Sequence, residues 1–325
     1  MKVAALVHFS LPDRCAGSEV VLHELMKAAV QAGHEATLFY TNRDAVRTWT
    51  GREPVQHLDG VKLVKVRNVI LGGQLMARTR PDVVVSHHQH VLHAIRLAKK
   101  LGAKSVFLTH NDMDLNERPI KLGADLVIHN SEWVRESLGR FGEDKESMVF
   151  HPPLTADRHT VDRTGDHVTL INLNQHKGAE IFYDLAARMP DTKFLGVIGG
   201  HGEQIIRRNL PNVTIMEHGP DMKRVWSQTR VLLMPSIYES YGLVAVEAGI
   251  NGIPTIANPT PGLIENLGKQ GLFVDRENTD AWVREIGSLK NPIRYADASD
   301  YARSRAQLAL DSTRQTLKQW CDWLG

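Results

Sequence analysis

Cysteines, long apolar runs and an excess of charge of one sign are all scarce in this sequence. Two cysteines, Cys15 and Cys321, stand near opposite ends of the 325 residues, which excludes a disulfide framework and fits a reducing compartment. No apolar run approaches the ~20 residues of a membrane-spanning helix, and the first ten residues have the pattern of a strand, not of a cleavable signal. We therefore expect a cytoplasmic protein, free or peripheral to a membrane.

The rest of the composition is that of an ordinary globular protein. Hydrophobic residues make up 42% and charged residues 23% of the chain, which excludes wholesale disorder and an extended coiled coil. At ~100–200 residues per domain, the length predicts two domains.

Short apolar runs alternate with helical patterns along the first half of the chain. This rhythm is typical of a parallel α/β sheet, whose strands are buried on both faces. We expect strands at residues 3–8, 36–40, 61–66, 83–86, 105–109 and 126–128, and helices at 18–32, 93–101 and 132–141.

The rhythm stops in a segment rich in proline and polar residues, 151–166, and then restarts, which predicts a linker between two α/β domains. The expected domains are residues 1–155 and 166–305, and a last helix, about 306–325, is expected to dock back on the first domain through Trp320 and Trp323. In the second half we expect strands at 168–173, 192–198, 213–216, 231–234 and 255–257, and helices at 179–188 and 243–251.

Ligands of open parallel sheets bind beyond the carboxyl ends of the strands, so the turns there are candidate sites. In the first such turn, Gly17 allows close backbone approach and Ser18 could cap the next helix, whose N–H groups favour an anion. In the second half, Lys177 stands just before a helix and could neutralise a diphosphate. Either feature taken alone is also compatible with an ordinary turn or a solvated lysine.

The strongest candidate is the segment 235–248, in which a buried strand runs through a loop into a helix. Gly242 permits close approach of a ligand, Glu239 lies in the loop and Glu247 lies one turn inside the helix. Each carboxylate could bind a pair of vicinal hydroxyls, and a polar group among such apolar neighbours needs a partner. A further strand-to-helix turn, 259–266, could line the same site.

These residues carry a resemblance to a known family. Glu239 and Glu247 form an E-x7-E pattern, and the run 235–265 contains Pro-Ser-x-x-Glu-Ser-Tyr-Gly-Leu, Gly-Ile-Pro and Pro-Gly-Leu-Ile-Glu. The chain thereby resembles retaining glycosyltransferases of family 4, and the resemblance covers nearly all of it. It implies the GT-B fold, with two Rossmann-like parallel-sheet domains facing across a cleft, and no cofactor beyond the nucleotide diphosphate sugar that serves as donor.

The resemblance also implies roles for individual residues. Glu239, His110 and Lys177 would be catalytic: the glutamate would hold the transferred sugar, the histidine would lie near sugar and acceptor, and the lysine would stabilise the leaving diphosphate. Glu247 would bind the ribose. The remaining donor-binding positions would be Gly17, Ser18, Asn172, Ser240, Tyr241, Gly242 and Leu243.

One position departs from the family pattern. Many members carry arginine five residues before the lysine, where this chain has Asn172, so phosphate charge must be met more by Lys177, by helix N-termini or by another basic residue. Front-face attack by the acceptor, with a phosphate oxygen taking its proton, is the mechanism that the resemblance implies. It needs no divalent metal, and no Asp-x-Asp motif lies in a suitable loop.

Three histidines, His87, His88 and His90, follow an expected strand. They could bind a metal, contact the acceptor or simply make a loop polar; we favour an acceptor-side position and expect no metal site.

The near-neutral formal charge of +2 is a cancellation. Residues 43–104 hold 12 Lys and Arg against 4 Asp and Glu, and the rest of the chain holds 27 against 33. This basic region is either a solvated face or the binding surface for an anionic acceptor: lipid, glycan or nucleic acid, including a modified DNA base. No obligate protein partner is evident. The alternative functions are a non-hydrolysing nucleotide-sugar 2-epimerase and a catalytically silent sugar-nucleotide-binding protein.

Overall fold

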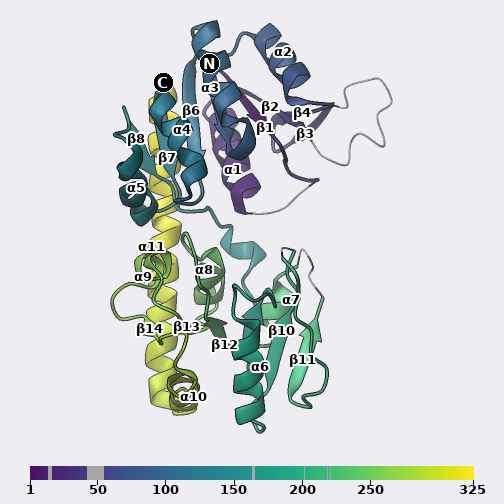
Figure 1. Ribbon diagram of the computed structural model, residues 1–325, viewed down its shortest axis with the longest axis vertical. Coiled ribbons are helices and arrows are strands. Elements are labelled where there is room, and N and C mark those ends of the chain that lie inside the picture. Colours follow the sequence, from purple (N-terminus) through teal and green to yellow (C-terminus); the bar gives the residue numbers. More distant parts are fainter. Residues whose placement is uncertain (14–16, 42–54, 163–164, 201, 218, 220) are drawn as a thin grey trace. The chain divides into compact units, whose positions relative to one another are not determined.

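The computed structural model describes residues 1–325 except 14–16, 42–54, 163–164, 201, 218 and 220. The described chain divides into two compact units. Unit 1 comprises Met1–Pro153 and Ser312–Gly325, and unit 2 comprises Leu154–Asp311. Each unit is an α/β layer structure built on its own sheet (Figure 1). Among the described residues, none of the helices is both long and apolar enough to cross a membrane.

Unit 1 contains an eight-stranded sheet, sheet A, with the strand order β3-β4-β2-β1-β5-β6-β7-β8. All neighbouring strands pair in parallel except β3 and β4, which are antiparallel. The strands are β1 (Lys2–Val7), β2 (Glu35–Thr41), β3 (Val55–Leu58), β4 (Val61–Val66), β5 (Val83–His87), β6 (Lys104–Thr109), β7 (Leu126–His129) and β8 (Ser147–Val149).

Alternation along β1 shows how helices cover both faces of sheet A, because successive strand residues point to opposite faces. Val3, Ala5 and Val7 belong to a core cluster shared with α1 (Gly17–Gln31). Ala4 and Leu6 belong to a second cluster on the other face, shared with α2 (Val69–Thr79) and α3 (Val91–Leu101). Two shorter helices, α4 (Glu117–Leu122) and α5 (Glu132–Leu138), extend the cover near β6 and β7.

The last helix, α11 (Pro292–Leu324), ends in unit 1. Trp320 is completely buried in the cluster shared by α1 and sheet A. Its indole N–H donates to the carbonyl of Leu25 at 2.9 Å, and its ring stacks on Trp323 with centroids 5.7 Å apart. The end of the chain therefore supplies part of the core of the unit that contains its beginning.

Unit 2 contains a six-stranded parallel sheet, sheet B, with the order β11-β10-β9-β12-β13-β14. The strands are β9 (His167–Ile171), β10 (Phe194–Val197), β11 (Val213–Met216), β12 (Thr229–Met234), β13 (Thr255–Ala257) and β14 (Leu272–Phe273). The helices are α6 (Ala179–Arg188), α7 (Lys223–Trp226), α8 (Leu243–Ile250), α9 (Pro261–Leu267), α10 (Thr279–Ser288) and the first part of α11.

The faces of sheet B are again covered by different helices. One core cluster joins β9 to α6 and α10, with Phe182 and Trp282 completely buried. The other joins β10 and β12 to α7, α8 and α9. Helices α6 and α8 follow the neighbouring strands β9 and β12, so both begin at the carboxyl edge of sheet B, the edge where ligands of parallel sheets bind.

Candidate functional site

Three loops meet at the carboxyl edge of sheet B. They follow β9 (residues 172–178), β12 (235–242) and β13 (258–260). Hydrogen bonds join them: the Ile237 amide donates to the His176 carbonyl at 2.9 Å, and the Asn258 side chain donates to the Ser236 carbonyl at 2.9 Å. The residues that the sequence singled out in the second half of the chain lie in and beside these loops.

Lys177 and Glu239 form an ion pair across the first two loops. The same Glu239 oxygen accepts a 2.9 Å hydrogen bond from the Ser236 hydroxyl. The Glu239 side chain is only 13% exposed and that of Lys177 30%, so the pair is partly shielded from water and its charges act on one another and on a ligand more strongly than surface charges do.

Both helices that begin here lack a side-chain cap. Gly178 precedes α6 and Gly242 precedes α8; each has a left-handed backbone, with φ of 92° and 84°, and neither helix start receives a side-chain hydrogen bond. The first N–H groups of a helix have no partner within the helix, and together with the helix dipole they favour a bound anion. Lys177 stands directly beside one of these two starts.

The loop before α8 is fixed by packing. Tyr241 is buried, and the side chain of Asn266 donates to the carbonyls of Tyr241 and Gly242, both at 3.0 Å. Burial, and after it the neighbouring Glu265 carboxylate, raises the pKa of Tyr241 above its usual range. Ser240 and Leu243, on either side, are partly buried.

Glu247 lies inside α8 and is 92% buried, with its Oε2 3.2 Å from His159 Nδ1. His159 belongs to the segment expected as a linker, and Asn251 holds that segment: its amide donates to the His159 carbonyl at 3.0 Å, and its oxygen accepts from the Val161 amide at 2.9 Å. The sequence signalled the glutamate but not its partner, because no short-range pattern connects residues 159 and 247.

Asn172 organises the loop after β9. Its backbone is left-handed, with φ of 73°, a conformation that asparagine tolerates better than most residues. Its side-chain oxygen accepts from Gln204 at 2.8 Å and from Asn174 at 3.0 Å. Asn174 in turn accepts from the Lys177 amide at 2.8 Å, so a chain of amide contacts positions the turn that carries the lysine.

Arg276 is a site residue that the sequence reasoning missed. Its guanidinium donates to the carbonyls of Pro235 and of Gln175, the latter at 3.0 Å, and so connects the loops that carry Glu239 and Lys177. Burial lowers its pKa from the ordinary arginine value. It follows β14, about a hundred residues from Lys177, and a lone arginine in a polar turn gives no sequence signal.

In unit 1, Gly17 and Ser18 lie in the first described turn of α1, and the Ser18 hydroxyl donates to the Glu19 carboxylate at 3.0 Å. The hydroxyl that was expected to cap the helix is thus engaged with a neighbouring side chain. Nothing in unit 1 tests a contact of these residues with a diphosphate, and that role stays a prediction.

Histidines gather at the carboxyl edge of sheet A. His87 is completely buried, and its Nδ1 lies 2.9 Å from Nε2 of His110, close enough for one hydrogen bond. Burial, and after it the surrounding imidazoles, lowers the pKa of both His87 and His110 well below the usual value. His88 lies against both rings, whereas His90 contacts the Thr41 hydroxyl at 3.1 Å. The structure therefore brings His87, His88 and His110 together and directs His90 elsewhere.

Comparison with known proteins accounts for both units. Residues 16–158 match the model of glycosyltransferase family 4, and residues 167–291 match that of glycosyl transferases group 1. Between them the two models cover most of the chain. The chain is a glycosyltransferase.

Curated relatives of this glycosyltransferase carry one recurrent name. A D-inositol 3-phosphate glycosyltransferase of Pseudarthrobacter chlorophenolicus is 25% identical over 90% of this chain and 86% of its own. The protein of the same name from Rhodococcus opacus is 36% identical over 79% of this chain and 66% of its own.

Solved structures show the same fold. HepE of Anabaena, determined in complex with UDP-glucose, superposes with a TM-score of 0.77 at 15% identity and covers 100% of this chain and 99% of its own. A sucrose-phosphate synthase from Thermosynechococcus elongatus gives a TM-score of 0.76 at 15% identity, with the same coverage. The expected GT-B class, two parallel-sheet α/β domains, is thereby confirmed.

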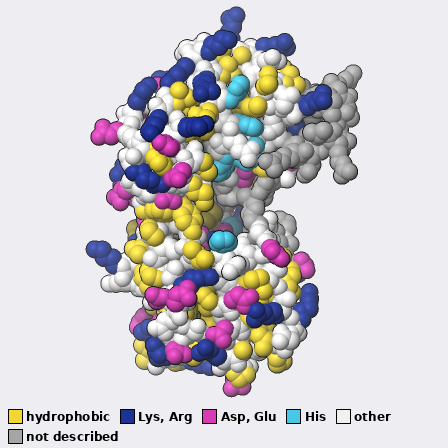
Figure 2. Space-filling model, in the orientation of Figure 1, with side chains coloured by type: hydrophobic (Ala, Val, Ile, Leu, Met, Phe, Trp, Pro, Cys, Tyr) yellow, Lys and Arg dark blue, Asp and Glu magenta, His cyan; other side chains and the backbone are white. Residues whose placement is uncertain are grey.

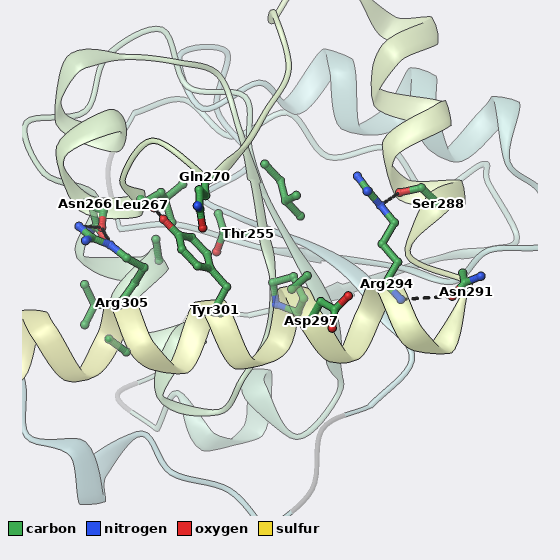
Figure 3. Close-up of a pocket in the computed structure, with 18 of the residues that line it drawn as sticks. Thr255, Asn266, Leu267, Gln270, Ser288, Asn291, Arg294, Asp297, Tyr301 and Arg305 are labelled. Atoms are coloured by element: carbon green, nitrogen blue, oxygen red, sulfur yellow. Dashed lines mark hydrogen bonds between the residues drawn. The ribbon is translucent and has the colours of Figure 1, made fainter.

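A cavity of about 700 Å³ lies elsewhere in unit 2 of the glycosyltransferase, against α11 (Figure 3). Thr255 and Leu272, which line it, begin β13 and β14, so the cavity lies at the amino ends of these strands. Figure 3 shows three side chains of α11 extending toward the elements beside it. The Tyr301 hydroxyl donates to the Leu267 carbonyl and the Arg294 guanidinium to the Ser288 hydroxyl. The Arg305 guanidinium donates to the Asn266 carbonyl. The cavity is therefore on the side of sheet B opposite to the carboxyl edge, where ligands of parallel sheets bind.

Proposed function

We propose that this glycosyltransferase moves a sugar from a nucleotide diphosphate sugar to an acceptor hydroxyl with retention of anomeric configuration. The observation that carries the proposal is the Lys177–Glu239 pair beside two uncapped helix starts at the carboxyl edge of sheet B. A cation and helix-start N–H groups that no side chain caps suit the diphosphate, and a carboxylate beside them suits sugar hydroxyls.

Lys177 and the N–H groups at the starts of α6 and α8 would bind the diphosphate. Negative charge develops on it as the glycosidic bond breaks, and donors fixed in advance stabilise that charge without reorganising. Asn172 would act through the turn that carries Lys177, since its side-chain oxygen is already bonded to Gln204 and Asn174. The backbone from Ser240 to Leu243 would contact sugar and phosphate.

Glu239 and Glu247 would bind hydroxyls at the two ends of the donor. Ser236 and Lys177 hold the Glu239 carboxylate in one orientation, which suits a group that must fix the transferred sugar. Glu247 would bind the ribose, with its second oxygen against His159. A uridine donor is the first candidate, because HepE was determined with UDP and with UDP-glucose.

The acceptor would be bound by unit 1, with His110 nearest the reaction and His87, His88 and His90 around it. The acceptor oxygen would attack the anomeric carbon from the face that the diphosphate leaves, and a phosphate oxygen would take its proton. The basic region 43–104 favours an anionic acceptor; its residues 43–54 lie outside the described part of the chain.

Calorimetric titration with UDP and UDP-glucose tests the donor site. In the parent protein we expect saturable binding of both. Glu239→Gln should retain UDP binding within about tenfold and lose at least about 100-fold in turnover, because it keeps the side-chain shape and removes the charge that holds the sugar hydroxyls. Glu136→Gln is the matched control, since that side chain is exposed on α5 in unit 1 and should change neither quantity.

Transfer is then assayed against lipid, glycan and DNA acceptors, and the anomeric configuration of the product is read by NMR. An inverted product would contradict retention. An epimerised nucleotide sugar formed without acceptor would point to the isomerase, and UDP-glucose binding with no turnover on any acceptor would point to a silent binding protein.

A further inference from the structure

Histidines end three neighbouring strands of sheet A. His8 directly follows β1, His87 is the last residue of β5 and His110 directly follows β6, and these strands stand side by side in the order β1-β5-β6. Because their carboxyl ends share one edge, the imidazoles gather there without any short sequence motif. Figure 2 shows histidine side chains in a strip on the visible face of unit 1.

Three of these rings are arranged as a metal site would arrange them. Ligand nitrogens of His87, His88 and His110, one from each ring, lie within 4.8 Å of one another. The ring centroids are 4.6 Å apart for His87 and His88, 5.0 Å for His87 and His110, and 4.9 Å for His88 and His110. Three imidazoles on a tetrahedral ion, with bonds of about 2.0–2.1 Å, have ring centres about 5 Å apart.

The backbone at His88 makes this triangle possible. Side chains of consecutive strand residues point to opposite faces, so His87 and His88 would ordinarily diverge. His88 instead has a left-handed backbone, with φ of 52°, which is uncommon for a residue with a side chain. The turn brings its ring to 4.6 Å from that of His87.

Burial adds an independent observation. His87 is completely buried, and its Nε2 has no hydrogen-bond partner among the described residues, although buried polar atoms in proteins are nearly always bonded. One nitrogen of this ring contacts His110, and the other has bonding capacity that the described side chains do not use.

We propose that His87, His88 and His110 bind one divalent transition-metal ion of the zinc class. Three imidazole nitrogens suit zinc, copper, nickel and iron better than magnesium or calcium, which prefer oxygen. The expectation of a chain without a metal site is replaced by this proposal. His90 is not included, because its Nε2 contacts Thr41.

Three protein ligands leave a tetrahedral ion one open position, as in catalytic zinc sites. His88 also lines a cavity of about 400 Å³ within unit 1, together with His8, Leu92 and Leu115. An oxygen of a small ligand in this cavity could take the open position. Metal binding itself does not rest on the proposed transfer reaction, because it needs none of Lys177, Glu239 and Glu247, which belong to unit 2.

Equilibrium dialysis of the chelator-stripped protein against zinc tests the proposal, and the visible absorption of the Co²⁺-substituted protein reports the coordination. We expect one ion per chain and the intense bands of tetrahedral Co²⁺. His88→Asn and His110→Asn should each weaken zinc binding at least about tenfold. Loss of a group that merely orients a metal ligand already lowers metal affinity or activity about 10–100-fold.

His57→Asn is the matched control, because this histidine of unit 1 is exposed on β3. Thermal unfolding in chelator shows whether each variant folds. Binding that does not saturate, or that His57→Asn weakens as much as His88→Asn does, would overturn the proposal. UDP titration in chelator is run in parallel: retained UDP binding without zinc binding would reject this proposal alone, and the reverse would reject the donor site alone.

Discussion

Gly178 shows, at the scale of single residues, how closely the loops of the proposed donor site approach each other. A Cβ added there would lie 2.5 Å from Cγ of Pro235, and the backbone has a φ of 92°. The glycine that begins α6 therefore allows the loop with Lys177 to lie directly against the loop with Glu239. Arg276 joins the same loops through their carbonyls.

We predict that Gly178→Ala lowers UDP affinity by about tenfold or more and destabilises unit 2 by about 1–3 kcal/mol, because the added methyl must displace Pro235 and adopt a strained backbone. Calorimetry and thermal unfolding measure the two effects. Gly287→Ala is the control: it lies in α10 with nothing within 4 Å of an added Cβ and should be neutral or slightly stabilising. Unchanged UDP binding in Gly178→Ala would contradict the close approach of the loops.

Asp125 gives a prediction about pH. Burial acts to raise the pKa of its carboxyl, but hydrogen bonds from the Ser105 backbone and hydroxyl and from Lys145 outweigh burial and hold the pKa below its ordinary value. A depressed carboxyl pKa stabilises the fold above the unfolded-state pKa of about 3.9 and loses this contribution as the pH falls through the folded-state pKa.

Asp125→Asn should therefore unfold more easily than the parent at pH 7, and the difference should shrink below about pH 4. Urea unfolding of both proteins between pH 3 and pH 7 measures it. Asp114→Asn, at a side chain that is 91% exposed, should follow the parent at every pH. A difference that stays constant down to pH 3 would show that the charge of Asp125 is not the cause.

At the scale of whole elements, regular patterns were easier to predict than glycine-containing or edge segments. Helix 179–188 and strand 255–257 have the expected bounds. Helix α2 was missed because Gly72 and Gly73 lower helix propensity, yet added Cβ atoms there would lie 2.9 Å from Leu6 and 2.8 Å from His93. Strand β3 was missed because three of its four residues are exposed, and so it shows no alternation.

The residues of the candidate site also fall into two groups: those that a sequence pattern marks and those that only the fold brings together. Glu239, Glu247 and Lys177 carry a family resemblance that can be recognised in the sequence. By contrast, tertiary contacts set His159 beside Glu247 and place Arg276 on the carbonyls of the two site loops. The His87–His88–His110 triangle depends on one left-handed backbone angle at His88. Spacing along the chain could not supply that angle.

The end of α11 leads to a prediction at this scale. Trp320 is completely buried in unit 1, and replacing a buried tryptophan by alanine costs about 3–5 kcal/mol. We predict that Trp320→Ala destabilises unit 1 by this amount and leaves UDP binding by unit 2 intact; chemical denaturation and UDP titration check the two parts. Leu308→Ala, at a position of α11 that is 57% exposed, should change neither. Equal loss of UDP binding would show that the helix end also maintains unit 2.

For the molecule as a whole, charge is distributed unevenly along the chain. The 12 basic against 4 acidic residues in region 43–104 lie in the half that would bind the acceptor. We predict that the protein binds vesicles containing phosphatidylglycerol at 50 mM NaCl and does not bind phosphatidylcholine vesicles. The vesicle affinity should fall steeply toward 300 mM NaCl because the charges are screened. UDP binding should depend only weakly on salt. If vesicle binding and UDP binding showed the same shallow salt dependence, the basic region would be only a solvated face.

The course of α11 also affects how the protein is made. A ribosome releases residues 154–311 before residues 312–325, so unit 2 has all its sequence while unit 1 still lacks Trp320, which its core needs. The portion synthesised first would then finish folding after unit 2, with the surface beneath Trp320 exposed until residues 312–325 have been made. A nascent chain in this order depends on residues 312–325 to bury apolar surface that has been exposed since early in synthesis.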